Sequence, residues 1–357
     1  MRGHAGLFDV DDRLRRLSDL GDQLEAYARV VDFEAFRPEL DKALSYTSGP
    51  QGGRPPYDPV MMLKVLVIQT ANNLSDERTE FLINDRLSFM RFLGLGLSDR
   101  VPDARTIWLF RERLTSRCDP VLFERFDAML CEAGYIAMSG QIVDSSWPRR
   151  AAQHEGGGRT TSRPAASKAW KDKPAKLRHK DRDARWTVKF TKAKPQADGT
   201  LPPVDIAIPA LGYQNHISID CKHGLIRKWM ATDAAAYEGA RLREGLLDKT
   251  NTARTVWADT AYRSNANETF MEKNGFVSRI HRKKPPGRPM PEATRHANNL
   301  KSKVRSRVEH VFAEQKSRMG LLIRTVGIAR ATTRIGLANI LYNMKRLMFL
   351  KRRPVTA

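Results

Sequence analysis

The segments QIVDSS (residues 141–146) and TVWADTAYRS (residues 255–264) each carry an aspartate at the end of a short apolar run. A carboxylate at the end of a buried strand loses hydration, so Asp144 and Asp259 require a partner or a metal ion. A third acid, Glu309, lies in RSRVEHVFAEQK, within the most basic stretch of the chain. This combination indicates a divalent-metal site that faces a polyanion, and it favours metal-dependent phosphodiester chemistry on DNA or RNA.

Around these segments, candidate strands and helices alternate. Short runs rich in β-branched and aromatic residues follow Gly134, at residues 136–144, 204–208, 216–220, 225–231, 255–258 and 276–280. Candidate helices separate the later runs or follow them, at residues 235–247, 265–273, 298–319 and 335–350. This order predicts an α/β domain with a mixed sheet flanked by helices.

Helical spacing dominates the first 135 residues. Leucines recur at the spacing of one helix face near the N-terminus, and further helical stretches lie at residues 60–74, 76–92, 103–113 and 121–133. Asp58 is placed to cap the first of these stretches, and Pro59 suits its first helical position. We therefore predict an all-helical N-terminal domain, residues 1–135, followed by a catalytic domain, residues 136–357.

The net charge of +22 is concentrated in two blocks. Residues 149–194 hold 15 Lys and Arg against 4 Asp and Glu, and residues 279–353 hold 20 against 3. A basic run is commonly a solvated face, but two blocks interleaved with an acidic triad favour a nucleic-acid surface. We predict that residues 149–200 form a basic loop insertion in the catalytic domain.

Composition excludes several other classes of protein. The chain has no run of 18 apolar residues and no apolar signal region near its N-terminus, so we expect neither a membrane span nor secretion. Cys118, Cys131 and Cys221 are too far apart in sequence for a disulfide framework or a zinc knuckle. A protein of the reducing cytoplasm is the simple interpretation.

The helix that carries Glu309 has two distinct faces. An apolar stripe consists of Val304, Val308, Val311, Phe312 and Met319. Arg305, Glu309 and Lys316 follow a neighbouring strip, at intervals of four and seven residues. A surface helix with an ordinary Arg305–Glu309 ion pair explains the same spacing, and the spacing alone leaves both interpretations open.

These motifs resemble those of bacterial insertion-sequence transposases of the DDE type. The strip R-x3-E-x6-K resembles the Tyr-x2-Arg-x3-Glu-x6-Lys signature of the insertion-sequence five-like group, with Ser302 where the signature has Tyr. IVDSS and WADTAYRS resemble the two Asp blocks, and GYQNHISIDCKHGLI resembles the strand pair between them. RPPYDPVMMLKVL and VPDARTIWLFRERL resemble the N-terminal domain of the same group, so the resemblance covers nearly the whole chain.

The resemblance implies a fold and a reaction. The catalytic domain would be RNase H-like, with Asp144 and Asp259 on neighbouring strands and Glu309 on a later helix. These three residues would be catalytic and would bind two Mg²⁺ ions, with Mn²⁺ as a substitute. The reaction would be hydrolysis at transposon ends, followed by attack of a 3′-hydroxyl on target DNA.

The resemblance also implies partners. They would be double-stranded DNA, as terminal inverted repeats and as target, and a second copy of the chain in a homodimeric paired-end complex. The helical domain would then serve end binding or dimerisation, and the protein would be nucleoid-associated in a bacterial cytoplasm. Arg305 and Lys316 would contact DNA phosphates near the cleavage site.

Further DNA-binding candidates lie in the two basic blocks: Arg149, Arg150, Arg185, Trp186, Lys283 and Lys284. An aromatic side chain between cations can stack on a splayed base, but packing against the sheet edge is the more common role of such a tryptophan. The loop that holds the two lysines is either a DNA-tracking segment or a solvated linker. Two other functions also remain open: an RNase H-like nuclease or resolvase without strand transfer, and a catalytically inactive DNA-binding relative.

Overall fold

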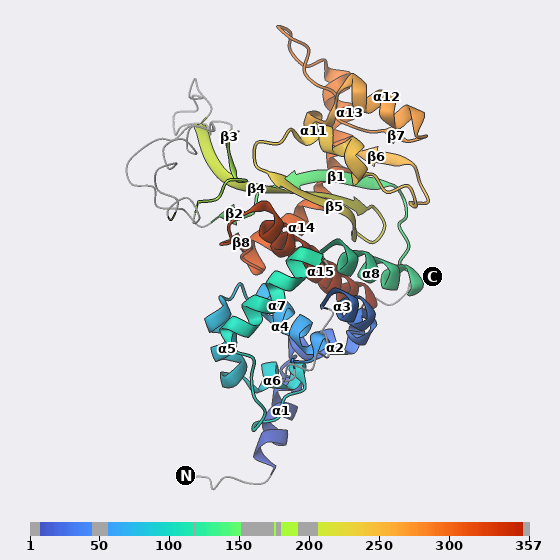
Figure 1. Cartoon of the computed structure of the whole chain (residues 1–357). Helices are drawn as coiled ribbons and strands as arrows, with labels where there is room; N and C mark the ends of the chain where they lie inside the picture. Colours follow the sequence, from blue (N-terminus) through green and yellow to red (C-terminus); the bar gives the residue numbers. More distant parts are fainter. Residues whose placement is uncertain are drawn as a thin grey trace, which may run out of the picture. The chain divides into compact units, whose positions relative to one another are not determined.

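The computed structural model describes residues 8–44, 56–117, 119–150, 175, 180–191 and 206–352 (Figure 1). The chain divides into two compact units. The helical unit comprises Met1–Ile136, Ser317–Gly320 and Gly336–Ala357. The sheet unit comprises Ala137–Lys316 and Leu321–Ile335.

The N-terminal part of the helical unit consists of helices throughout its described residues. They are α1 (Asp9–Asp19), α2 (Gln23–Val30), the 3₁₀ turn η1 (Glu34–Phe36), α3 (Arg37–Leu44), α4 (Pro59–Ala71), α5 (Asp76–Asp85), α6 (Leu87–Leu93), α7 (Ala104–Arg117) and α8 (Asp119–Glu132). The predicted cap of α4 is present, because the Asp58 Oδ1 atom accepts the Met61 N–H at 2.8 Å. Most of α4 is buried, which makes it the central helix of this unit.

The last helix, α15 (Ile328–Arg352), belongs partly to each unit. Its residues from Gly336 onward cluster with the N-terminal helices, whereas the sequence analysis assigned all of residues 136–357 to one domain. The physical reason is length, because a helix of 25 residues spans about 38 Å and exceeds the core of a single small unit. Its buried side chains include Ala338, Leu341 and Met344.

The sheet unit contains a mixed six-stranded sheet, as the sequence predicts. Its strands are β1 (Gln141–Ser146), β3 (Arg185–Thr191), β4 (Ile206–Asp220), β5 (Ile226–Asp233), β6 (Thr255–Trp257) and β7 (Val277–Ser278). Strand β1 is central: it pairs antiparallel with β4 and parallel with β6. Strand β5 pairs antiparallel with β4, and β7 pairs parallel with β6. A separate two-stranded sheet joins β2 (Arg149–Arg150) to β8 (Leu322–Ile323).

Helices cover both faces of this sheet. On one face, α11 (Glu238–Arg241), the π-helical turn η2 (Leu242–Leu246) and α12 (Asn265–Lys273) enclose a core that includes Val143, Val256 and Met271. On the other face, α13 (Glu292–Arg305) contacts β6, and the 3₁₀ turn η4 (Ser306–Val308) contacts β1. The neighbours of Val143 on β1 therefore point toward the α13 side, since strand side chains alternate.

Two features of the sheet differ from the prediction. Residues 206–220 form one strand of 15 residues, whereas the sequence suggested two short strands. Their length follows from their pairing, because the first half of β4 binds β3 and the second half binds β1 and β5. Strand β3 was not predicted, since its apolar residues lie among cations in a basic block. Residues 151–174, 176–179 and 192–205, which make up most of the predicted basic insertion, lie outside the described residues.

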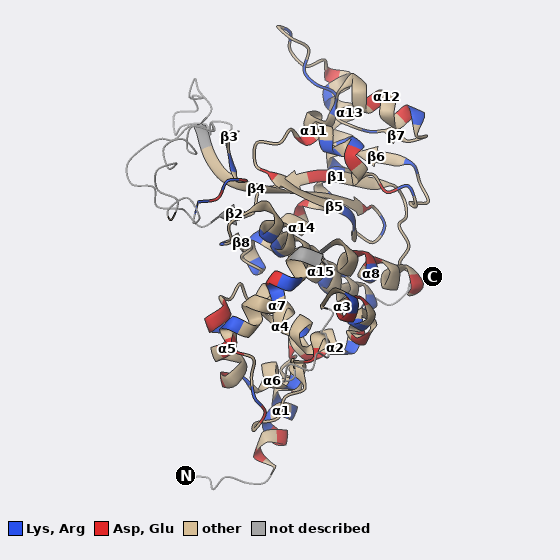
Figure 2. Cartoon of the chain, viewed as in Figure 1, with Lys and Arg blue, Asp and Glu red and all other residues tan. Residues whose placement is uncertain are grey.

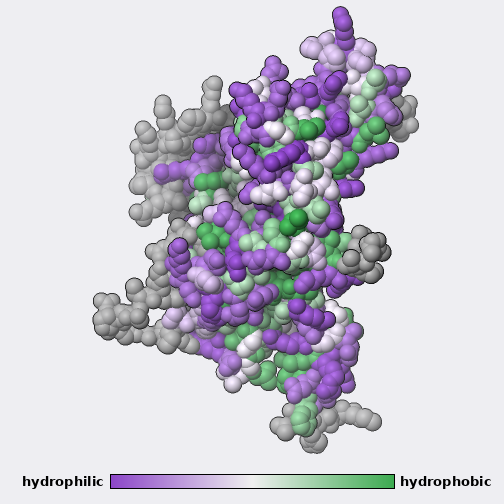
Figure 3. Space-filling view, turned by 90° about the vertical axis from the view of Figure 1, so that its right-hand side faces the viewer, coloured by the Kyte–Doolittle hydropathy of each residue, from purple (hydrophilic) through white to green (hydrophobic). Residues whose placement is uncertain are grey.

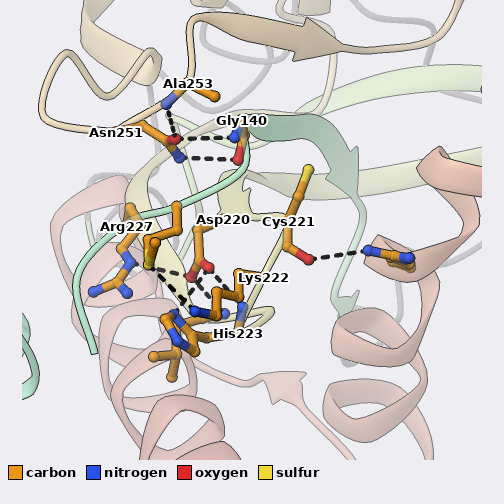
Figure 4. Close-up of polar contacts among 11 residues, drawn as sticks. Gly140, Asp220, Cys221, Lys222, His223, Arg227, Asn251 and Ala253 are labelled. Carbon is orange, nitrogen blue, oxygen red and sulfur yellow. Dashed lines mark hydrogen bonds and ion pairs between the residues drawn. The ribbon is translucent and has the colours of Figure 1, made fainter. Parts of the chain in front are cut away.

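A polar network at the start of β1 ties together the segments that carry the three acids (Figure 4). The Gly140 carbonyl accepts the Cys221 N–H and the Asn251 side-chain amide, both at 2.9 Å. Arg307, two residues before Glu309, donates to the Cys221 carbonyl at 3.1 Å. Glycine is required at position 140, because φ is +87° and a Cβ atom would lie 2.6 Å from the Trp257 ring.

Asp220 organises the turn between β4 and β5 in the same network (Figure 4). Its side chain is fully buried and accepts the N–H groups of His223 at 2.7 Å and Leu225 at 3.2 Å. Its second oxygen also accepts the Nε–H of Arg227 at 3.2 Å. The turn that anchors Cys221 thus depends on one buried carboxylate.

The surface is mixed in polarity. Large exposed hydrophobic side chains occur on separate elements, including Phe81 on α5, Trp108 on α7 and Val277 on β7. Hydrophobic residues accordingly interrupt the hydrophilic surface in several places (Figure 3). Among the helices of the described residues, none combines the length and hydropathy needed to cross a bilayer.

Candidate active site

The parallel pairing of β1 and β6 places the two aspartates at equivalent positions along the strand direction. Gln141 lies opposite Val256, and Ile142 lies opposite Trp257. Two residues beyond the second pair lie Asp144, which is still on β1, and Asp259, which follows the end of β6. The Asp259 Oδ1 atom accepts the Ala261 N–H at 2.8 Å, so this residue caps the 3₁₀ turn after β6. Neighbouring strands lie about 4.8 Å apart, and side chains alternate along each of them. The register therefore makes the two carboxylates neighbours on the α13 side of the sheet.

Arg305 joins the strand acid to the helix acid. Its Nη1 atom lies 2.5 Å from the Asp144 Oδ2 atom, and its Nη2 atom lies 3.5 Å from the Glu309 Oε1 atom. The other Asp144 oxygen, Oδ1, accepts the Ser145 N–H at 2.8 Å. The i,i+4 ion pair considered in the sequence analysis is present, and it is the weaker of two contacts. The shorter one crosses 161 positions of sequence.

Burial and neighbouring charges change the acidity of Asp144. Burial raises the pKa of its carboxyl group to about 7, against the opposing effects of Arg305 and the Ser145 N–H. The negative charges of Asp259 and Glu309 raise the pKa further. Asp259 and Glu309 are thus close enough to Asp144 to influence its carboxyl group electrostatically.

We expect the metal-free chain to lose stability through Asp144 as the pH rises from about 4 to about 7. In this window the folded chain retains a proton on Asp144 that the unfolded chain has released, so the free energy of unfolding falls with increasing pH. Urea denaturation at several pH values, in EDTA, measures the effect. Across this window, the free energy of unfolding of the wild type should fall relative to that of Asp144→Asn. A difference between the two proteins that stays constant with pH would contradict the prediction.

Tyr262 lies on the face of the sheet opposite to Asp144 and Asp259. Its side chain is fully buried in the core with Val143 and Ala258. Burial raises the pKa of its hydroxyl well above the ordinary value, and the charges of Asp144, Glu238 and Asp259 add to this effect. The phenol therefore stays protonated near the acidic site.

The segment around Glu309 is helical but irregular. After α13 and η4, α14 covers Glu309–Ala313, and a π-helical turn covers Glu314–Arg318. Val308 and Val311 are fully buried, which confirms the predicted apolar stripe over this part of the helix. The helix type changes at η4 and again at the π-helical turn, so the rotation per residue varies between Arg305 and Lys316. The Lys316 Nζ atom lies 5.9 Å from the centre of the Phe312 ring.

The remaining DNA-binding candidates occupy three separate elements. Arg149 and Arg150 form β2. Arg185 and Trp186 are exposed on β3, and the Trp186 side chain retains 38% of its accessible surface. Lys283 and Lys284 are exposed between β7 and α13.

The donor chemistry of the three acids fits a divalent cation, since Mg²⁺ and Mn²⁺ prefer carboxylate oxygens. The three carboxylates nevertheless do not converge on one metal position in this structure. Within the described ranges, no group of three or more His, Cys, Asp or Glu side chains is positioned to hold a metal ion. The Asp144 Oδ2 atom is paired with the guanidinium group of Arg305. A metal ion at this oxygen therefore requires the guanidinium group to move away.

His281 is a neighbour of the acids that the sequence analysis did not identify. Its N–H donates to the Ala258 carbonyl at 3.1 Å, directly before Asp259. Its Nε2 atom lies 3.4 Å from the hydroxyl of Ser302, the residue that replaces the Tyr of the signature. Burial lowers the pKa of His281, Arg305 lowers it further, and Asp259 opposes both. No local pattern singles out a histidine in a loop after a two-residue strand.

Family models match two stretches of this chain. Residues 12–113 match the family described as Transposase domain (DUF772), and residues 211–344 match the family described as Transposase DDE domain. Both families are transposase domains. The second match contains Asp259 and Glu309, whereas Asp144 lies before it. Comparison with curated proteins and with solved structures gives no significant match.

The two transposase matches support a transposase function for this chain, and with it action on DNA. They also agree with the order of the elements, because the first match covers predicted helices and the second covers the sheet from β4 onward.

Proposed function

We propose that this chain is a DDE transposase of the insertion-sequence five-like group, which cuts DNA at the ends of its own element. In this proposal, the freed 3′-hydroxyl then attacks target DNA. The observation that carries it is the level register of Asp144 and Asp259, together with the Arg305 bridge from Asp144 to Glu309. Two matches to transposase families support the transposase part of this proposal.

The strand order supports an RNase H-like catalytic domain. The order β5–β4–β1–β6–β7 has an antiparallel hairpin on one side of β1 and parallel strands on the other. In such a sheet, a functional site is expected at the carboxyl ends of the parallel strands β1 and β6.

Asp144, Asp259 and Glu309 would hold two Mg²⁺ ions, with Mn²⁺ as a substitute. Bound metal ions would activate the attacking oxygen and stabilise the leaving oxygen of the phosphodiester. Before loading, Arg305 neutralises part of the negative charge beside Asp144. Once released from Asp144, the Arg305 guanidinium group would be available for a DNA phosphate, and Lys316 would provide a second contact.

The proposed substrates are double-stranded terminal repeats and target DNA. Processing two ends together calls for a homodimer, in which the helical unit would bind ends or form dimer contacts. Arg149, Arg150, Arg185 and Trp186 would extend the DNA surface beyond the acids, with Lys283 and Lys284 on a separate segment.

The test of this function is cleavage of a labelled duplex that ends in the inverted repeat flanking the coding sequence. Reactions contain Mg²⁺, Mn²⁺, Ca²⁺ or EDTA. We expect cutting at the repeat tip with Mg²⁺ or Mn²⁺ and none with EDTA, followed by joining of the 3′ end to a supercoiled target. Cutting without regard to the repeat would favour the nuclease. Binding without cutting in any metal would instead favour the inactive relative.

A further inference from the structure

Four cations in the sheet unit form a cluster beside the proposed acids. Three of them lie in the basic block of residues 279–353, for which the sequence suggests only a general nucleic-acid surface. The four-cation cluster consists of Arg263, Arg279, Arg282 and Lys301. Arg263 follows η3 (Thr260–Tyr262), Arg279 and Arg282 follow β7, and Lys301 lies on α13. Lys and Arg residues are visible along the segment between β7 and α13 in Figure 2.

The Ile280 carbonyl is the focus of the cluster. It accepts the Lys301 Nζ–H at 2.9 Å and the Arg263 Nη1–H at 3.4 Å. Asn298 of α13 fixes the backbone nearby, because its side chain exchanges two hydrogen bonds of 3.0 Å with the N–H and carbonyl of Arg282. Two of the four cationic side chains are therefore held by one backbone carbonyl, and the backbone of Arg282 is fixed to α13.

Positive charge in the cluster is poorly balanced. Glu268 lies 3.5 Å from Arg263 and also accepts the Ser278 hydroxyl at 3.0 Å. In the described part of the chain, no ion pair with a carboxylate is formed by Arg279, Arg282 or Lys301. Burial lowers the pKa of Lys301, and the charges of Arg263, Arg282 and Arg279 lower it further. An anion placed here would relieve this repulsion.

The cluster adjoins the acids through the backbone of β6. Arg279 donates its N–H to Val256, and His281 donates its N–H to Ala258, so this segment runs alongside the end of β6. The next residue of the β6 chain is Asp259. On α13, Lys301 precedes Arg305 by four residues, which is one helical turn. The cluster thus adjoins Asp259 through the backbone of β6, and it adjoins Arg305 through one turn of α13.

We infer that the four-cation cluster binds a backbone phosphate of the DNA strand next to the cleavage site. This inference rests on the proposed function, since that function supplies DNA as the ligand. A phosphodiester suits the cluster because it is a compact anion that Arg and Lys contact without reading sequence. Such a contact would fix the position of the strand relative to Asp144 and Asp259.

The first experiment measures DNA binding against salt concentration in EDTA, with a labelled duplex of arbitrary sequence and the full chain. We expect Lys301→Ala and Arg282→Ala each to reduce the slope of log K against log salt by about 1, the value for one lost phosphate contact. Arg295→Ala is the control, because Arg295 is exposed on the same helix and already paired with Glu292 at 2.6 Å. An equal reduction in all three variants would overturn the inference.

The second experiment uses repeat-end duplexes in which single phosphates are replaced by neutral methylphosphonates. At one position near the cut, neutralisation should weaken binding of the wild type clearly more than binding of Arg282→Ala, which has already lost one of the cations at that phosphate. Arg282→Ala protects the test against misfolding, since its side chain is exposed and its Asn298 contacts are made by backbone atoms. Identical profiles for both proteins would overturn the cluster assignment, even if the wild type cleaves. Absence of cleavage with distinct profiles would overturn the proposed function alone.

Discussion

Asp144→Asn should abolish DNA cleavage, by about a thousandfold or more, and leave DNA binding largely intact. Asparagine has nearly the same size, so the buried end of β1 can accommodate it, but its neutral amide cannot balance the charge of a divalent cation. Binding should persist because the phosphate contacts proposed above are made by cations elsewhere in the site. Cleavage of the labelled repeat-end duplex with Mg²⁺ and its binding in EDTA provide the two measurements.

The same result is expected for Asp259→Asn and Glu309→Gln. Glu314→Gln is the matched control for the helix, because it removes an acid five residues further along without touching the proposed triad. Full cleavage activity in any one triad variant would exclude that residue from the site. Loss of activity in Glu314→Gln as well would indicate a general effect of charge on this helix.

Asp220→Asn should lower the free energy of unfolding by about 3–5 kcal/mol. The substitution leaves the Arg227 guanidinium, which is 3% exposed, buried beside a neutral amide. It also weakens two backbone hydrogen bonds that shape the turn after β4. Urea denaturation at neutral pH measures the loss.

Asp233→Asn serves as the control for this prediction. Asp233 lies at the far end of the same hairpin, where its side chain accepts the Ala235 N–H at 2.9 Å near the surface. We expect a loss of about 1 kcal/mol or less for this exposed turn contact. If the two substitutions had equal effects, the buried pair of Asp220 and Arg227 would not be the stabilising element that its burial suggests.

Much of the local structure could be read from sequence. The Asp58 cap, the helix at Asn265–Lys273 and the strand that ends near Asp259 follow from turn chemistry and residue periodicity. Each depends on neighbours within about one turn of helix or one short strand, so the necessary information is local. The basic strand β3 gives too little periodic signal for the same reasoning, because its apolar residues lie among cations.

The candidate site was predictable only in part. Three acids and the Arg305–Glu309 spacing were visible because each interrupts an apolar or basic run. The contact between Arg305 and Asp144 was not, since no local pattern relates residues 161 positions apart. The changes of helix type after Arg305, where Val308 and Val311 are fully buried, were not predicted either.

The sequence by itself indicated the three candidate acids and most of the strands and helices, because these depend on local spacing and composition. Only the tertiary structure decided the register that places Asp144 beside Asp259. It also decided that the shorter contact of Arg305 is made with Asp144 rather than with Glu309. It also gathered Arg282 and Lys301 beside the acids, from segments that are merely basic in sequence. These outcomes depend on pairing and packing across the sheet unit, which are long-range interactions that no single segment encodes.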